Sequence, residues 1–253
     1  MNEQHLSWSR VAAIYEKEFI NPYLPDVHSP LKRTLRRLAR RGAQSVADLG
    51  CGIGPLLPFL AEHFGDVWAV DFAEGMLARA RENTHAYPHI NYLGSTFNDL
   101  APLHGKLEVA VAVNSFVMPD PRELDACLRE VRSCLKPGGC FLGILPAMDA
   151  VHYLTMLLVE RGLNLGQPLD AARQHAAHHN DHAYYDFAFG QFCFQGLEQH
   201  FWQPFEIHHR LSRAGFRLRQ LKKVHLSWKQ FSGRRDLQQH PAPWDWFFLA
   251  RPA

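Results

Sequence analysis

Three alternate glycines directly after an apolar, strand-like run constrain the fold of this chain more than any other feature. They lie in SVADLGCGIGPLL, residues 45–57, as Gly50, Gly52 and Gly54. A glycine-rich turn that leaves a strand and opens a helix lets a ligand touch bare backbone, and the helix N-terminus favours a negatively charged group. A dinucleotide fingerprint would have its third glycine where this chain has Pro55, and no G-K-[ST] follows. The loop therefore predicts a ligand site that is neither a dinucleotide fingerprint nor a P-loop.

The segment around the loop alternates short β-like runs with helix patterns, the arrangement that forms a parallel sheet covered by helices. We expect strands at residues 45–49, 66–71, 90–95, 107–114 and 140–146. The clearest helix starts at Asp120, which forms a capping-box-like pair with Glu123 around Pro121, and KPGG at 136–139 ends it. Residues 148–204 are helical, aromatic and histidine-rich in pattern, without a convincing strand. A basic helix at 29–42, a helix at 205–216 and strands at 216–228 and 244–250 complete the pattern.

Composition and charge exclude several classes of protein. The 253 residues carry a net charge of +2, so no global charge favours a nucleic-acid or membrane partner. The five cysteines form no C-x-x-C pair, which argues against a disulfide framework and a zinc ribbon. The N-terminal sequence lacks the apolar region of a secretory signal, and the longest apolar run is shorter than the roughly 20 residues of a membrane span. We therefore expect a cytoplasmic protein.

Several segments, in order, resemble the class I S-adenosylmethionine-dependent methyltransferases. VADLGCGIGPLLPFLA is similar to motif I of that family, and VWAVDFAEGMLARARE is similar to its second strand and the helix that follows. MPDPRELDACLREVRSCLKPGGCFLGI resembles the fourth helix, the K-P-G-G turn and the fifth strand. FEIHHRLSRAGFRLRQLKKV and WDWFFLARP resemble the late helix and the last two strands. The resemblance implies an α/β fold, with a Rossmann-like, doubly wound sheet of seven strands, mostly parallel with an antiparallel last strand, and a helical lid insertion.

The same resemblance divides the chain into four parts. Residues 1–42 would form an N-terminal helical segment that covers the site, and residues 43–147 the core that binds S-adenosylmethionine. Residues 148–204 would form a helical lid or substrate insertion. Residues 205–253 would supply the final helix and the last two strands of the core sheet.

The resemblance also implies S-adenosylmethionine as the cofactor and assigns residues to it by position. The glycine loop would approach the methionine moiety, with Asp48 helping to position its amino group. Asp71 would accept hydrogen bonds from the two ribose hydroxyls, a role that suits an acceptor-only carboxylate. Where the family often has an aspartate that contacts the adenine amino group, this chain has Ser95. The full set expected at the cofactor is Asp48, Gly50, Cys51, Gly52, Gly54, Asp71, Phe72, Met76, Ser95, Thr96, Phe97, Asn114, Ser115 and Phe116.

Within that set, the resemblance assigns the remaining roles by region. Phe72 and Met76 would pack near the adenine, and the backbone amides of Thr96 and Phe97 would contact its ring. Residues 114–116, after the fourth strand, would line the methyl-donor end.

The acceptor is less constrained than the cofactor, because methyl transfer from a sulfonium depends mainly on alignment and a base is optional. The chain has NSFVMPDP after the fourth strand, where enzymes acting on adenine or glutamine nitrogens have [D/N]-P-P-[Y/F]. The aromatic residues within 148–204 suit a small aromatic or hydrophobic acceptor, methylated at O, N or C under the lid. Tyr15 and His178 are the candidates for a catalytic role.

Metal binding and two rival functions complete the predictions. The histidines of residues 175–182 lack the acid of an H-E-x-x-H motif, so no metal is expected. One alternative is a non-catalytic module that binds S-adenosylmethionine and has no acceptor pocket. The other is an RNA methyltransferase that uses the basic helix at 32–41, although no aromatic residues interleave with its charges. The identity of the acceptor, the use of a base and the oligomeric state stay open.

Overall fold

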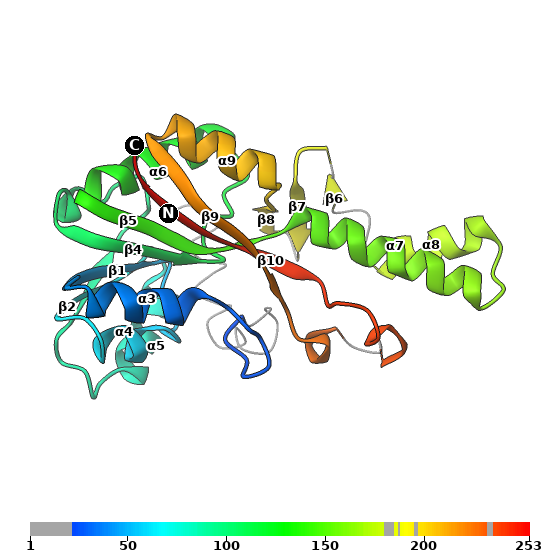
Figure 1. Ribbon diagram of the computed structural model, residues 1–253, viewed down its shortest axis with the longest axis horizontal. Helices are drawn as coiled ribbons and strands as arrows, with labels where there is room; N and C mark the ends of the chain where they lie inside the picture. Colours follow the sequence, from blue (N-terminus) through cyan, green and yellow to red (C-terminus); the bar gives the residue numbers. More distant parts are fainter. Residues whose placement is uncertain (1–21, 180–184, 187, 195–196, 232–234) are drawn as a thin grey trace.

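The computed structural model describes residues 22–179, 185–186, 188–194, 197–231 and 235–253, and its main sheet has seven strands (Figure 1). Their spatial order is β3-β2-β1-β4-β5-β10-β9. β10 runs antiparallel to both of its neighbours, and the other pairs are parallel, which confirms the expected topology. The strands are β1 Ser45–Leu49, β2 Asp66–Asp71, β3 Ile90–Gly94, β4 Leu107–Val113, β5 Leu135–Pro146, β9 Phe216–His225 and β10 Trp244–Pro252.

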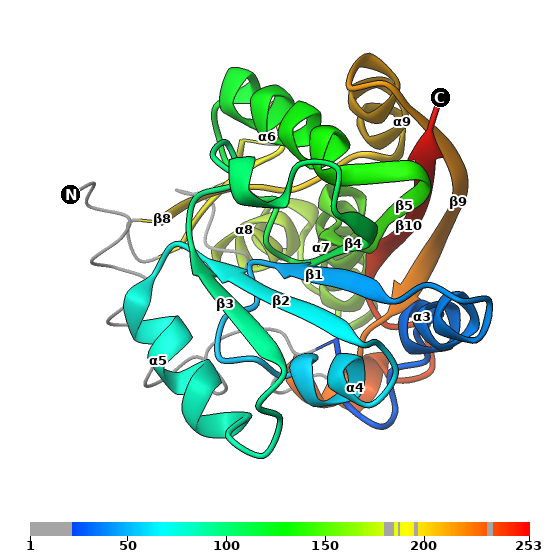
Figure 2. The ribbon, with the colours of Figure 1, turned by 90° about the vertical axis from the view of Figure 1, so that its left-hand side faces the viewer.

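Helices cover both faces of this sheet (Figure 2). One face carries α3 Leu31–Arg40, α4 Leu57–Ala61 and α5 Glu74–Asn83, and the other carries α6 Pro121–Cys134 and α9 Pro204–Arg213. Short 3₁₀ turns lie at Ala101–Leu103, Trp228–Gln230 and Arg235–Leu237. Alternation along the strands supplies both cores, because Val46 joins the cluster under α3 whereas Ala47 and Leu49 join the cluster under α6 and α9. The sheet is therefore buried between two apolar layers.

The helix predicted from Asp120 forms as expected, but the turn after it differs. The Asp120 carboxylate accepts a hydrogen bond from the backbone N–H of Arg122 at 2.8 Å, and Pro121 occupies the first turn. The helix ends at Cys134, before KPGG. The strand that follows begins at Leu135, so KPGG lies inside β5 rather than in front of it. The pairing of β4 with β5 shifts register there, and Gly138 has φ of 79°, so the turn is taken up as an irregularity in the strand.

The insertion after β5 combines a helix pair with a small sheet. It contains α7 Met148–Asn164, α8 Leu169–His179, and the antiparallel strands β6 Tyr185–Asp186, β7 Gln191–Phe194 and β8 Leu197–His200. The expectation of a segment without strands is therefore wrong for its second half, because these short strands satisfy their backbone groups by pairing with one another. In Figure 1, α7 and α8 extend together beyond the end of the main sheet. A lid function for this insertion stays a prediction.

Two hydrogen bonds fasten the ends of the insertion to each other. The Trp202 N–H donates to the carbonyl of Pro146 at 2.8 Å, and the Met148 N–H donates to the carbonyl of Trp202 at 3.0 Å. The indole of Trp202 is buried and donates to the carbonyl of Phe116 at 2.7 Å. The insertion thus begins and ends at the carboxyl ends of β4 and β5.

Within the described residues, no helix combines the length and the apolar character needed to cross a membrane.

Candidate functional site

The glycine loop joins β1 to α4 at the carboxyl edge of the sheet and is held against β2. The N–H groups of Gly50 and Cys51 both donate to the carbonyl of Val70, at 2.8 and 3.0 Å. Gly50, Gly52 and Gly54 all have positive φ, of 73°, 54° and 82°. Because residues with a Cβ rarely adopt this conformation, the three alternate glycines are a requirement of the turn.

The three glycines differ in what surrounds them. A Cβ on Gly50 would lie 2.3 Å from Cβ of Ser115, and a Cβ on Gly54 would lie 2.9 Å from Leu57 and 3.3 Å from Ala80. These two positions allow the loop to pack closely against β4 and α5. A Cβ on Gly52 would meet nothing within 4 Å. Gly52 is therefore the glycine whose backbone faces open space and can be approached by a ligand.

Asp71, the last residue of β2, fixes this loop. Its Oδ2 accepts a hydrogen bond from the N–H of Gly52 at 3.0 Å, and its Oδ1 accepts one from the N–H of Ala73 at 2.9 Å. The residue is 6% exposed, so the carboxylate is buried against the loop. A carboxylate is an acceptor-only group, the type that hydroxyl donors of a ligand would bind.

Asp48, near the end of β1 and just before the loop, is a buried carboxyl group. It is 2% exposed, and no hydrogen bond to its carboxylate is present within the described part of the chain. Burial, and secondly the nearby charge of Asp71, raise the pKa of Asp48 to about 7. A buried carboxylate of this kind favours a ligand that brings a positive charge to it.

The expected residues after β3 and β4 close the same edge of the sheet. The Ser95 N–H donates to the carbonyl of Asp71 at 3.1 Å, and its hydroxyl donates to the carbonyl of Asp99 at 2.6 Å. The hydroxyl of Thr96 donates to the side chain of Asn98 at 2.6 Å. The hydroxyl of Ser115 donates to the carbonyl of Leu49 at 2.6 Å. Both expected serines are thus bonded to the ends of the strands that carry Asp71 and the glycine loop.

Other expected cofactor residues present little side chain to a ligand. Cys51 packs in the core under α3, and Phe116 packs in the core under α6, where its ring stacks on Phe97 at a centroid distance of 4.9 Å. Met76 is buried in a small cluster with Ile53 and Ala73, and half-buried Phe72 packs against it. Contacts from Cys51 or Phe116 to a ligand would have to come from their backbone.

A second polar group at this edge joins β4 to β10. Asn114 is the only residue other than glycine with positive φ in the described segments, at 51°, and its Nδ2 donates to Oδ2 of Asp245 at 3.1 Å. Burial raises the pKa of Asp245 to about 7, although hydrogen bonds from Asn114 and from the backbone of Ala147 act to lower it. The other side-chain polar atom of Asn114, its buried Oδ1, has no hydrogen-bond partner among the residues described. The left-handed backbone and the unsatisfied oxygen make Asn114 a candidate ligand contact.

Sequence reasoning missed Asp245 and Trp244. The sequence feature that could have revealed the site is the single carboxylate, Asp245, inside the apolar run WDWFFLA. A charged side chain is rarely buried in a strand for structural reasons alone. β10 is antiparallel, so its amino end lies at the edge where the parallel strands have their carboxyl ends. Asp245 pairs with Pro146 at the last position of β5 and thereby reaches Asn114.

The two catalytic candidates are not placed by the structure. Tyr15 lies outside the described residues, and His178 lies in α8 with its side chain outside them. His175, at the start of the same histidine cluster, has its Nδ1 3.0 Å from Oε1 of Gln167. Among the described residues, no group of three or more His, Cys, Asp or Glu side chains is arranged to hold a metal ion.

Comparison with known proteins agrees with this geometry. Residues 46–139 match a family model described as a methyltransferase domain. The chain is 31% identical over 137 residues to the ubiquinone/menaquinone biosynthesis C-methyltransferase UbiE of Rubrivivax gelatinosus, an overlap of 53% of this chain and 52% of that protein. The chain thus spans about half the length of this curated relative.

Solved structures share the fold over most of the chain. A crystal structure of an S-adenosylmethionine-dependent methyltransferase from Mesorhizobium loti gives a TM-score of 0.61 at 20% identity, over 88% of this chain and 96% of that one. A second similar structure is the 1,6-didemethyltoxoflavin-N1-methyltransferase of Burkholderia thailandensis, which has 1,6-didemethyltoxoflavin and S-adenosylhomocysteine bound. Its TM-score is 0.62 at 14% identity, over 99% of this chain and 87% of that one.

The sheet order, the glycine loop and the acid at the end of β2 define a Rossmann-like methyltransferase fold. Together with the match over residues 46–139, they show a methyltransferase domain whose fold is similar to that of S-adenosylmethionine-dependent methyltransferases.

Proposed function

We propose that this chain binds S-adenosylmethionine at the glycine loop and transfers its methyl group to a small-molecule acceptor. The observation that carries the proposal is the open backbone of Gly52 beside the Asp71 carboxylate. Asp71 would receive the ribose hydroxyls, and buried Asp48 would compensate the positive charge of the methionine amino group. The cofactor, when bound, supplies a methyl group on a sulfonium with a good leaving group. The chain's own contribution is to orient both reactants and exclude water.

The acceptor would lie beside the Asn114–Asp245 pair. This pair is at the same edge of the sheet as the glycine loop, and Ser115, next to Asn114, contacts Gly50. The buried Oδ1 of Asn114, which has no hydrogen-bond partner among the described residues, offers one hydrogen-bond acceptor to a small polar ring. UbiE is named as a C-methyltransferase and the toxoflavin enzyme as an N1-methyltransferase, so both support a small acceptor molecule.

Asp245 would act as the base when the acceptor must lose a proton. Its raised pKa, to about 7, results from burial and places the carboxylate close to the pH at which proton transfer is most efficient. Asn114 donates to one carboxylate oxygen and would orient the other toward the acceptor. A hydroxyl or ring N–H would pass its proton to Asp245 as its oxygen, nitrogen or conjugated carbon attacks the methyl group.

A turnover screen with Asp245→Asn tests this assignment. Methyl transfer from radiolabelled cofactor would be measured against phenols, quinols and N-heterocycles between about pH 5 and 9. With an active acceptor, the rate is expected to rise with pH to a plateau above about 7 in the unmodified protein, following ionisation of Asp245. Asp245→Asn should lose most of the rate and this pH dependence while keeping cofactor affinity.

Asp149→Asn provides the matched control, because Asp149 is a nearby carboxylate that accepts a hydrogen bond from the Trp246 indole at 2.9 Å. It should retain the pH profile. Tight cofactor binding with no turnover on any acceptor would instead support the non-catalytic module. A pH profile unchanged in Asp245→Asn would remove the base assignment alone.

The glycine loop gives a separate prediction about the cofactor. Gly52→Ala is expected to cost about 1–2 kcal/mol of stability, the cost of a left-handed conformation for a residue with a Cβ. Its methyl group would also occupy the open space above the loop and weaken binding of S-adenosylhomocysteine, measured by calorimetry. Gly42→Ala is the control, because Gly42 also has positive φ and open surroundings but follows α3. It should lose similar stability and no affinity. Equal affinities in the two variants would contradict the assigned ligand position.

A further inference from the structure

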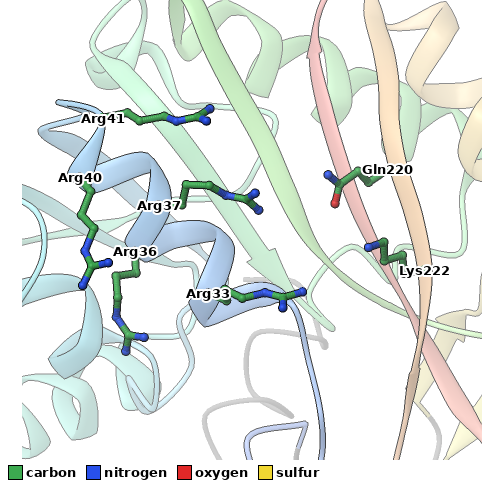
Figure 3. Close-up of a pocket in the computed structure, with 7 residues that line it drawn as sticks. All are labelled: Arg33, Arg36, Arg37, Arg40, Arg41, Gln220 and Lys222. Carbon is green, nitrogen blue, oxygen red and sulfur yellow. The ribbon is translucent and has the colours of Figure 1, made fainter.

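A basic groove of about 680 Å³ lies between α3 and the edge strand β9, away from the glycine loop (Figure 3). We define the basic groove by its lining residues. All of them are polar or charged: Arg33, Arg36, Arg37, Arg40, Arg41, Gln220 and Lys222. Six of the seven side chains carry a positive charge at neutral pH.

The groove exists because the sheet extends one strand beyond the cover of α3. β9 pairs only with β10 in the main sheet and forms its edge. Gln220 and Lys222 lie on the same face of β9 as Val224, and Val224 joins the buried cluster under α3. A helix that covered this strip of the sheet would need apolar residues at positions 220 and 222. Because both residues are polar, the strip stays open to solvent.

The arginines of α3 form two rows. Arg33, Arg37 and Arg41 point across the groove toward Gln220 and Lys222, whereas Arg36 and Arg40 point to the other side of the helix (Figure 3). The facing row has i, i+4 spacing, which places its side chains about 6 Å apart along the helix axis. Three cations repeat along one wall, and Lys222 lies on the opposite wall. This arrangement suits an elongated ligand with regularly spaced negative charges.

These charges have no counter-ions within the part of the chain that the structure describes. None of the salt bridges found there includes a basic residue of the groove. Arg36 differs from the others, because its Nε donates to the His63 ring at 3.3 Å. α3 has no acidic residue in its first turn and no side-chain cap. Repeated like charges at i, i+4 destabilise a helix, so α3 is arranged for an anionic ligand at the expense of its own stability.

We propose that the basic groove binds the phosphate backbone of an RNA strand. Five of its six cations are arginines, whose planar guanidinium groups form paired hydrogen bonds with phosphate oxygens. No aromatic side chain lines the groove for base stacking, so the contacts are with the backbone and independent of sequence. A membrane surface fits less well. In the described segments, the large exposed apolar side chains that could enter a bilayer lie elsewhere, at Met156, Leu163, Leu165, Leu169, Phe189 and Phe205.

RNA binding here is independent of the proposed acceptor. Lys222 is level with Ile144, because Phe247 pairs with both, and Ile144 is the last residue of β5 paired with β4. The groove therefore reaches the edge of the sheet that carries the site. β9 is nevertheless three strands from β4, a separation of about 14 Å. The bound RNA therefore need not supply the methylated atom.

The test is fluorescence anisotropy with a labelled oligouridine strand between about 50 and 200 mM salt. The groove variant is Arg33→Gln/Arg37→Gln/Arg41→Gln. The control variant, Arg79→Gln/Arg129→Gln/Arg173→Gln, removes three exposed arginines from α5, α6 and α8 and so matches the change in net charge. Loss of three phosphate contacts should lower the slope of log affinity against log salt by about 2 in the groove variant, with little change in the control. The strand should also raise the melting temperature of the unmodified protein and not that of the groove variant.

Three results would overturn the proposal. Oligouridine could fail to bind the unmodified protein at low salt. It could bind both variants with equal affinity, which would show a response to net charge alone. Vesicles of phosphatidylcholine and phosphatidylserine could bind through the groove arginines while oligouridine does not, which would identify a membrane surface instead. Because the replaced arginines are exposed, both variants should melt near the temperature of the unmodified protein, and Arg33→Lys/Arg37→Lys/Arg41→Lys should retain most of the salt dependence.

Discussion

Replacing Asp71 with alanine is expected to weaken S-adenosylmethionine binding by about 1.5–3 kcal/mol, or roughly 10- to 150-fold, the range for hydrogen bonds to a charged group. Two effects combine in this loss. The variant cannot accept the ribose hydroxyls, and it releases the N–H groups of Gly52 and Ala73 that the carboxylate holds at 3.0 and 2.9 Å. Isothermal titration calorimetry with S-adenosylhomocysteine measures the affinity, and a thermal melt establishes that the variant is folded.

Asp66→Ala is the matched control for this experiment. Asp66 begins the strand that Asp71 ends, so it lies about 17 Å away at the opposite edge of the sheet. Its carboxylate accepts a hydrogen bond from Asn91 at 3.2 Å and should have no influence on the cofactor. Asp71→Asn keeps one acceptor oxygen, so its affinity for S-adenosylhomocysteine should lie between those of Asp71→Ala and Asp66→Ala. An Asp71→Ala variant that is folded and binds with unchanged affinity would remove the ribose assignment.

Asp48→Asn is expected to stabilise the ligand-free protein at alkaline pH. In the folded protein burial raises the pKa of Asp48 from 3.8 to about 7, so the folded state holds a proton that the unfolded state has lost. The stability linked to this proton is fully present below about pH 4 and is lost as the pH rises through about 7. The Asp48→Asn variant has no such loss. Between about pH 4 and 7, its free energy of unfolding should therefore rise relative to that of the unmodified protein by up to about 4 kcal/mol. Urea unfolding at several pH values measures the difference.

The same substitution should weaken cofactor binding, because a neutral amide cannot compensate the amino group's charge. Asp120→Asn is the control. A hydrogen bond and charge from Arg122 lower the pKa of Asp120, so the stability it contributes is lost only as the pH falls. This variant should show no gain at alkaline pH. A free energy of unfolding for Asp48→Asn that parallels the unmodified protein at every pH would show that Asp48 carries no buried charge.

The core sheet could be predicted closely from the sequence, because its elements depend on local patterns. The strands at 45–49 and 66–71 have the expected bounds, and the Asp120 cap starts the helix where it should. The second half of the insertion could not be predicted in the same way. β7 and β8 have four residues each, too few for alternation to be distinguished from helical sequence, and their stability comes from pairing with each other.

That Gly52 and Asp71 come together could also be predicted from sequence, because they lie in a continuous motif and the strand that follows it. Their role at the cofactor stays a prediction. Side-chain direction was not accessible. Cys51 lies in the glycine motif and Phe116 follows the fourth strand, yet both side chains belong to the core. The partner of Asn114 could not be predicted at all, because Asp245 is 131 residues away and reaches it only through the antiparallel strand.

The position of β10 has a consequence for how the protein acquires its site. β10 lies inside the sheet, between β5 and β9, although both neighbours precede it in the chain. β9 therefore cannot join the main sheet until residues 244–252 have inserted beside β5. The Asn114–Asp245 hydrogen bond closes a loop of 131 residues, a contact of the kind that forms late and slows folding. The segment that carries the glycine loop could thus become structured well before the pair at Asn114 is assembled.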